Sequence, residues 1–99
     1  MKDPQAAEVA RHGLLRVKTT VAGTVVSVAV IGELDLSGVT SVEDPVRRAL
    51  ALHCPAQVIV DLRRITFIDS SGLRLLLVLA AEARAEQWRI TIVRGPAAV

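Results

Sequence analysis

The sequence is poor in aromatic side chains and in the residues that build disulfide or metal sites. Its 99 residues include one Trp, one Phe and no Tyr, so the bases of a single-stranded nucleic acid would find almost nothing on which to stack. The single cysteine, Cys54, cannot form an internal disulfide, and two histidines are too few for a familiar Cys/His zinc site. We therefore expect no cofactor, no metal and no direct contact with nucleic acid, and we interpret Cys54 as a small buried thiol.

Long apolar segments are also missing. The segment from Met1 to Gln5 has no apolar core of the kind found in signal peptides. The longest apolar run, from Leu75 to Ala81, is far shorter than the roughly 18 residues that span a bilayer. These absences predict a cytoplasmic protein without membrane insertion. The net charge is only +2 and the arginines are spread along the chain, which gives little support to a polyanionic partner.

The overall composition is that of one folded domain. A hydrophobic fraction of 52% with 22% charged residues is too apolar for a disordered chain and too charged for a membrane protein. Residues 1–12 show no sustained apolar period, so we predict a loose N-terminal tail there and a single domain over residues 13–99.

Apolar patterns predict four strands. The first alternates with period two and is expected at an edge of the sheet, while the second is β-branched and is expected to be buried on both faces. The third is a short buried strand, and the fourth comes close to the end of the chain. These expected strands cover, in order, residues 14–20, 25–31, 57–62 and 89–94.

Two helices are expected between these strands. The first begins near Ser41 and ends at Cys54, with a core stripe of Val42, Val46, Ala49, Leu50 and His53. The second runs from Ser70 or Ser71 to about Gln87. Its stripe is Leu73, Leu76, Leu77, Ala80 and Arg84, with Leu75, Leu79 and Ala83 beside it. The order predicts an α/β fold with a mixed, mostly parallel sheet, an N-terminal antiparallel strand and packed helices.

The most informative segment is Asp69-Ser70-Ser71-Gly72, which lies between a buried strand and an apolar helix. Each of its first three residues is a good helix N-cap, and capping alone is one explanation of the segment. A second serine and a glycine exceed what a cap needs, and we expect Gly72 to leave the first turn open to another protein. A phosphate on Ser70 would lie at a helix N-terminus, where the backbone dipole favours an anion.

An enzyme is not indicated. A nucleophile elbow requires Gly-x-Ser-x-Gly and a partner histidine, whereas Ile68 stands in place of the first glycine here. The chain also lacks the glycine-rich loop that holds the phosphates of a nucleotide. We therefore predict no catalytic residues.

Three segments together carry a family resemblance: Gly32-Glu33-Leu34-Asp35-Leu36, Asp61-Leu62, and the run from Phe67 to Leu73 that contains the serine pair. Over residues 14–99 the chain resembles the STAS domain family of bacterial anti-sigma factor antagonists. The resemblance implies a single STAS-like domain that regulates transcription by protein binding. It implies that Ser70 is phosphorylated and that Asp35, Asp69, Ser71 and Gly72 shape the partner surface.

The implied partners are an anti-sigma factor that is also a serine kinase, to which ATP and Mg²⁺ would belong, and a phosphatase. The dephosphorylated domain would bind the anti-sigma factor, and phosphorylation would release it. A homodimer stays open, as does a ligand-sensing role. The alternative is a regulatory subunit of a membrane transporter that acts by constitutive protein binding. The family usually has another helix after the position of Arg94, which this sequence is expected to lack.

Overall fold

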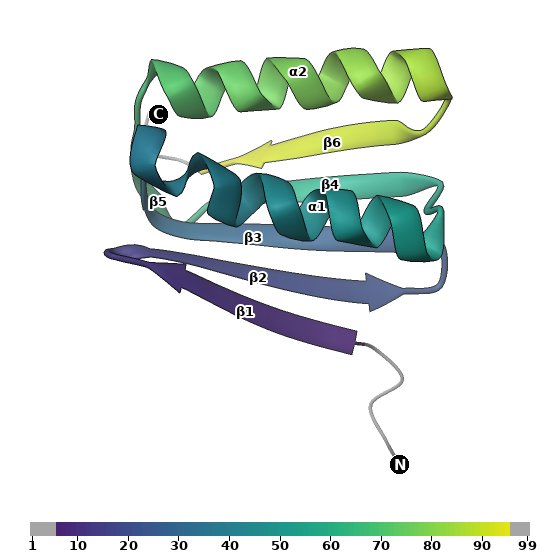
Figure 1. The fold of residues 1–99 in the computed structure, drawn as a ribbon, viewed down its shortest axis with the longest axis horizontal. Helices are drawn as coiled ribbons and strands as arrows, with labels where there is room; N and C mark the ends of the chain where they lie inside the picture. The colour runs from purple at the N-terminus through teal and green to yellow at the C-terminus, as the bar shows by residue number, and fades with distance from the viewer. Residues whose placement is uncertain (1–5, 96–99) are drawn as a thin grey trace.

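The computed structural model of the chain describes residues 6–95, which form one sheet with two α-helices on one of its faces. Figure 1 shows α1 and α2 side by side, both running along the strands. In chain order the elements are β1 (Ala6–His12), β2 (Leu15–Ala22), β3 (Val25–Leu34), the 3₁₀ helix η1 (Leu36–Gly38), α1 (Val39–His53), β4 (Gln57–Leu62), β5 (Ile65–Ile68), α2 (Ser70–Glu86) and β6 (Arg89–Arg94).

The sheet has the order β1-β2-β3-β4-β6, with β5 also paired to β3. The pairs β1–β2 and β2–β3 are antiparallel hairpins, while β3 pairs in parallel with β4 and β5, and β4 in parallel with β6. The predicted α/β order, with parallel neighbours after an antiparallel start, is therefore confirmed. Parallel neighbours require crossover connections, which α1 and α2 provide.

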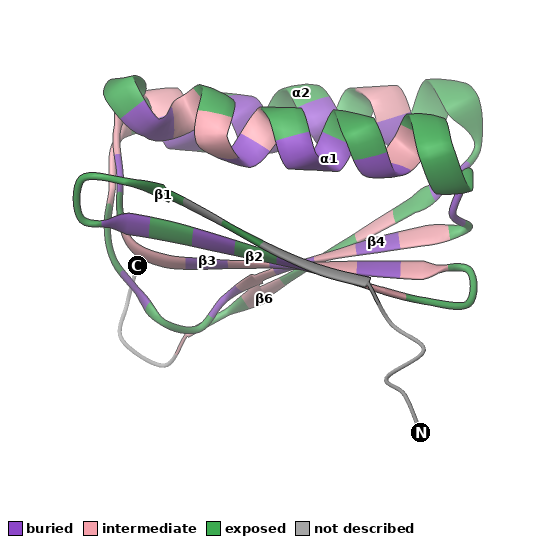
Figure 2. Cartoon of the chain, turned by 60° about the horizontal axis from the view of Figure 1, so that its bottom comes forward, coloured by how far each residue is buried: buried purple, intermediate pink, exposed green. Residues whose placement is uncertain are grey.

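The core lies between the sheet and the helices. Over residues 25–31 of the central strand β3, every second residue is buried there, as Val26, Val28 and Val30 are. The intervening residues of β3 are half-buried on the opposite face, which no described helix covers (Figure 2). The prediction that this strand is buried on both faces is therefore wrong, because both crossover helices lie on the same side of the sheet.

The N-terminal prediction is also wrong for part of its range. Residues 6–12 form β1, which pairs antiparallel with β2 along its whole length. Pairing satisfies backbone groups and does not require an apolar alternation, so the composition of this segment did not reveal it. Because β1 occupies the outer position, β2 is not the edge strand we expected. Residues 1–5 lie outside the described part of the chain.

The buried face of α2 differs from the expected stripe. Leu73 and Leu77 are 52% and 71% exposed. A neighbouring stripe of α2 residues contacts the sheet instead. Leucines occupy several sides of α2, so the apolar pattern is compatible with more than one buried face. The position of the sheet determines which face is buried. The buried residues are Gly72, Leu75, Leu76, Leu79 and Ala83.

Three smaller predictions differ from the structure: the start of α1, the burial of His53 and Cys54, and the segment that forms β5. The helix α1 begins at Val39, two residues before Ser41, because η1 leads directly into it. His53 and Cys54 are exposed at its C-terminal end, where Cys54 takes the left-handed conformation that ends many helices. The bounds of β4 and β6 and the start of α2 agree with prediction, whereas β5 was not predicted as a strand.

Candidate functional site

The site is built around the first turn of α2. Asp69 is its N-cap, and one carboxylate oxygen accepts hydrogen bonds from the backbone N–H of Ser71 at 2.9 Å and of Gly72 at 3.1 Å. Two backbone donors that the helix leaves free are thereby satisfied. Asp69 therefore supplies the cap, and neither serine hydroxyl is needed for it.

The two serines differ in environment. Ser70 is exposed at the first position of α2, and Ser71 is partly buried on the side of the helix that faces α1. Within the described chain the hydroxyl of Ser70 has no hydrogen bond. Ser70 is thus the hydroxyl that another protein reaches more easily, while Ser71 contributes to the wall of a groove.

Gly72 has a packing role in the first turn of α2. A Cβ atom at this position would lie 2.8 Å from the Ile68 side chain and 3.0 Å from the Leu34 side chain. Gly72 is buried, so the first turn of α2 sits directly on the ends of β3 and β5. The small size of Gly72 therefore serves the close approach of helix and sheet, while its part in shaping a partner surface stays a prediction.

Asp35 lies next to this turn in space. The backbone N–H of Asp69 donates a hydrogen bond of 3.1 Å to the carbonyl oxygen of Leu34, which joins the end of β3 to the start of α2. The Asp35 carboxylate accepts hydrogen bonds from the backbone N–H and the hydroxyl of Ser37, at 3.0 Å and 2.7 Å. The Ser37 hydroxyl and the backbone N–H groups hold the pKa of Asp35 below its usual value. The structure therefore brings the two predicted loops together and keeps Asp35 ionised.

Removing the Asp69 carboxylate is expected to destabilise this turn. In Asp69→Ala, two backbone N–H groups at the start of α2 lose their acceptor, and the free energy of unfolding should fall by about 1 kcal/mol. Asp69→Asn retains an acceptor oxygen and is the matched control. Urea unfolding followed by circular dichroism measures both variants, and equal stability of Asp69→Ala and wild type would contradict the capping role.

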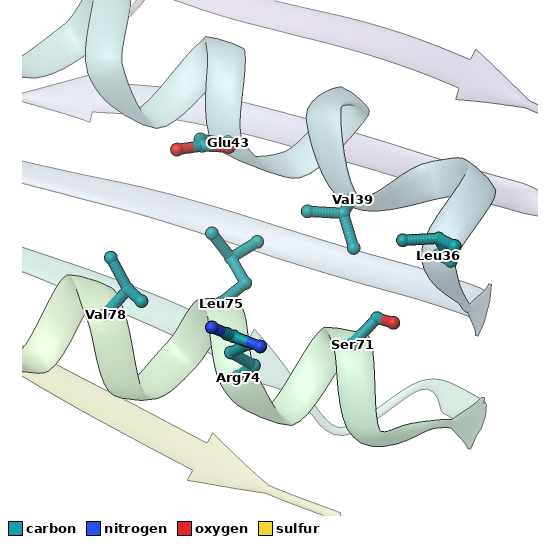
Figure 3. Close-up of a pocket in the computed structure, with 7 residues that line it drawn as sticks. All are labelled: Leu36, Val39, Glu43, Ser71, Arg74, Leu75 and Val78. Atoms are coloured by element: carbon teal, nitrogen blue, oxygen red, sulfur yellow. The ribbon is translucent and has the colours of Figure 1, made fainter.

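A groove of about 270 Å³ runs between α1 and α2 beside the serines. Figure 3 shows its two walls, one from η1 and α1 and one from α2, with apolar side chains on both and a guanidinium at the rim. The sequence did not reveal it, because it exists only when the two helices lie side by side. The lining residues are Leu36, Val39, Glu43, Ser71, Arg74, Leu75 and Val78.

An ion-pair network joins the two helices along this groove. The Arg47 guanidinium on α1 binds Glu82 on α2 through two hydrogen bonds of 2.8 Å and 2.9 Å, and also contacts Glu43 at 2.8 Å. This pairing lowers the pKa of Glu82 and raises that of Arg47. All three groups are partly exposed, so each pair is weak by itself, but the two-pronged geometry links the two helices across the groove.

Other kinds of site find no support in residues 6–95. These residues contain no group of three or more His, Cys, Asp or Glu side chains arranged to hold a metal ion. None of the helices described is both long and apolar enough to cross a membrane. The feature that stands out is the end of the sheet where Asp35, Ser70 and the groove meet.

Comparison with solved structures gives the same fold. An unphosphorylated form of the anti-sigma factor antagonist SpoIIAA matches with a TM-score of 0.64 and 24% identity, over 88% of this chain and 71% of that chain. The phosphorylated form of SpoIIAA, a Bacillus cell fate determinant, matches with a TM-score of 0.61 and 25% identity, over 86% and 68%. An anti-sigma factor antagonist from Mycobacterium paratuberculosis matches with a TM-score of 0.63 and 24% identity, over 98% and 75%.

A search among curated proteins gave no match. A family model described as "Mlab, STAS domain" matches residues 16–99, which include the whole of the site described above. With most of the chain matched by that model and the α/β fold shared with SpoIIAA, the chain belongs to the STAS domain family.

Proposed function

We propose that this chain is an anti-sigma factor antagonist that works by reversible protein binding and is switched by phosphorylation of Ser70. The observation that carries the proposal is an exposed serine at the start of α2 whose capping role is already filled by Asp69. A hydroxyl that the fold does not use is available to a kinase.

Phosphorylation at this position would leave the fold intact and change its surface. A phosphoserine carries about −1.5 to −2 charges, which the positive end of a helix dipole stabilises. At a protein interface the same charge would have to be desolvated and would repel nearby carboxylates. Phosphorylation of Ser70 therefore acts as a release signal, and the STAS relative SpoIIAA, whose phosphorylated and unphosphorylated forms both match this fold, supports this mode of action.

The partner in this proposal is an anti-sigma factor that is also a serine kinase. It binds the dephosphorylated domain at the surface formed by Asp35, Asp69 and Ser71 around Ser70. It later transfers the γ-phosphoryl group of its own ATP to the Ser70 hydroxyl and leaves ADP. A phosphatase that hydrolyses this phosphoserine restores binding, and the STAS domain itself performs no catalysis.

Mass spectrometry of the intact protein tests the acceptor. The chain is incubated with Mg²⁺-ATP and a candidate anti-sigma kinase whose activity is shown separately, and wild type is compared with Ser70→Ala and Ser71→Ala. We expect one phosphoryl group on wild type and on Ser71→Ala, and none on Ser70→Ala, because Ser70 is exposed whereas Ser71 is partly buried.

Two results would contradict the proposal. A phosphoryl group that persists in Ser70→Ala would place the acceptor elsewhere. Failure of wild type to accept phosphate, together with co-purification of the chain with a transporter ATPase or permease, would instead support constitutive binding as a transporter subunit.

A further inference from the structure

Among the residues described, Arg74 is the cation of the groove that has no anionic partner. Both carboxylates along this side of the helices, Glu43 and Glu82, are bound by Arg47. Arg74 lines the groove and, among the residues described, makes no hydrogen bond or ion pair (Figure 3). Its guanidinium presents five N–H donors at the edge of an apolar surface, which is an arrangement suited to an incoming carboxylate or phosphate.

The position of Arg74 on α2 connects the groove to Ser70. Residues four apart in a helix lie on the same side, one turn from each other, and their side chains can contact. Ser70 and Arg74 have this spacing, and both are exposed. A phosphate on Ser70 would offer three acceptor oxygens within reach of a long and flexible guanidinium side chain.

On the basis of the proposed function, we propose that Arg74 exchanges one anionic partner for another when Ser70 is phosphorylated. In the unphosphorylated chain, Arg74 binds a carboxylate of the partner protein whose neighbouring apolar side chain enters the groove. In the phosphorylated chain, Arg74 binds the phosphate of Ser70 and no longer serves the partner. The phosphate thus acts by removing a contact as well as by adding negative charge.

The apolar part of the groove defines the other half of the partner. Leu36 is 74% exposed, and Val39, Leu75 and Val78 line the space beside it. Because the Glu43 carboxylate on the opposite wall is already paired with Arg47, Arg74 is the charge in the groove left to attract a partner. The partner segment that fits this surface carries an aliphatic side chain with an Asp or Glu beside it.

The intramolecular half is tested on full-length chain with phosphoserine installed at position 70 during translation, so no kinase is required. A ³¹P NMR titration gives the second pKa of the phosphate in the wild-type background and in Arg74→Gln. We expect the pKa to rise by about 0.5 in Arg74→Gln, because a nearby cation favours the dianion. Arg84→Gln, which removes an exposed arginine farther along α2, is the matched control and should leave the pKa unchanged.

An identical phosphate pKa in wild type and Arg74→Gln would overturn the exchange, as would an equal rise in Arg84→Gln. Arg74→Lys retains the charge and should keep most of the lowered pKa. Since the phosphoserine is introduced without a kinase, this experiment can fail while Ser70 remains a genuine acceptor. It can equally succeed if no kinase is found, so the two proposals are tested separately.

The contact between Arg74 and the partner protein is tested by measuring the affinity of the two proteins. With the anti-sigma factor from the phosphorylation assay as the probe, unphosphorylated Arg74→Gln should bind about tenfold more weakly than wild type, and Arg84→Gln should bind as wild type does. Installing phosphoserine at position 70 should weaken binding by a smaller factor in Arg74→Gln than in wild type, since part of its effect runs through Arg74. Unchanged affinity in Arg74→Gln, or additive effects of the two changes, would overturn this half.

Discussion

Gly32→Ala is expected to lower the free energy of unfolding by about 3 kcal/mol. Gly32 has a φ of +99°, a conformation that L-residues rarely adopt. An added Cβ would also fall on the backbone carbonyl of Leu14, and neither backbone can move without disturbing the β2–β3 pairing. At this position β3 changes its register with β5, so Gly32 also directs the strand towards Asp35.

Gly23→Ala is the matched control for this prediction. Gly23 also has a positive φ, +61°, but nothing lies within 4 Å of an added Cβ, so only the cost of the conformation remains. We expect about 1 kcal/mol for Gly23→Ala. Chemical denaturation of both variants measures the difference, and equal losses would show that the Leu14 carbonyl does not restrict position 32.

Leu34→Ala is expected to cost about 3 kcal/mol, with a loss of order at the site. Leu34 is fully buried at the end of β3, and its side chain lies 3.0 Å from the position that a Cβ on Gly72 would take. Its carbonyl accepts the hydrogen bond from the Asp69 N–H, so the residue supports the start of α2 through backbone and side chain alike. A cavity beneath this turn would loosen the segment that presents Ser70.

Leu36→Ala is the control, since it removes the same atoms from a side chain that is largely exposed at the start of η1. We expect its stability to change by less than about 0.5 kcal/mol. Hydrogen exchange at the first amides of α2 should become faster in Leu34→Ala and remain as in wild type in Leu36→Ala. Slow exchange in both variants would mean that Leu34 does not hold this turn.

The sequence predicted the fold wherever apolar pattern and topology agreed. Strands β4 and β6 are short β-branched runs bounded by turn or helix-end residues, so their limits could be placed to the residue. The prediction failed where pairing did not depend on apolar side chains, as in β1, and where one helix is apolar on several sides, as in α2. In both cases the structure was determined by tertiary contacts, which leave no local pattern in the sequence.

The candidate site could also be predicted only in part. Asp69, Ser70 and Ser71 are adjacent in the sequence, so their association with a helix start could be predicted from capping alone. The roles within that group could not, because only the structure shows that Asp69 caps the helix and that Gly72 is buried. The groove and Arg74 were not predicted, since the walls of the groove come from two helices that β4 and β5 separate in the chain.

The link that Arg47 makes between α1 and α2 affects how a partner would associate with the groove. Both helices pack on the sheet in one hydrophobic core, and Arg47 adds a link between them through Glu82. A groove whose walls already have their final spacing loses little conformational entropy when it is filled. Association would then resemble the meeting of two rigid bodies, with a rate limited by diffusion and orientation and not by rearrangement of this domain.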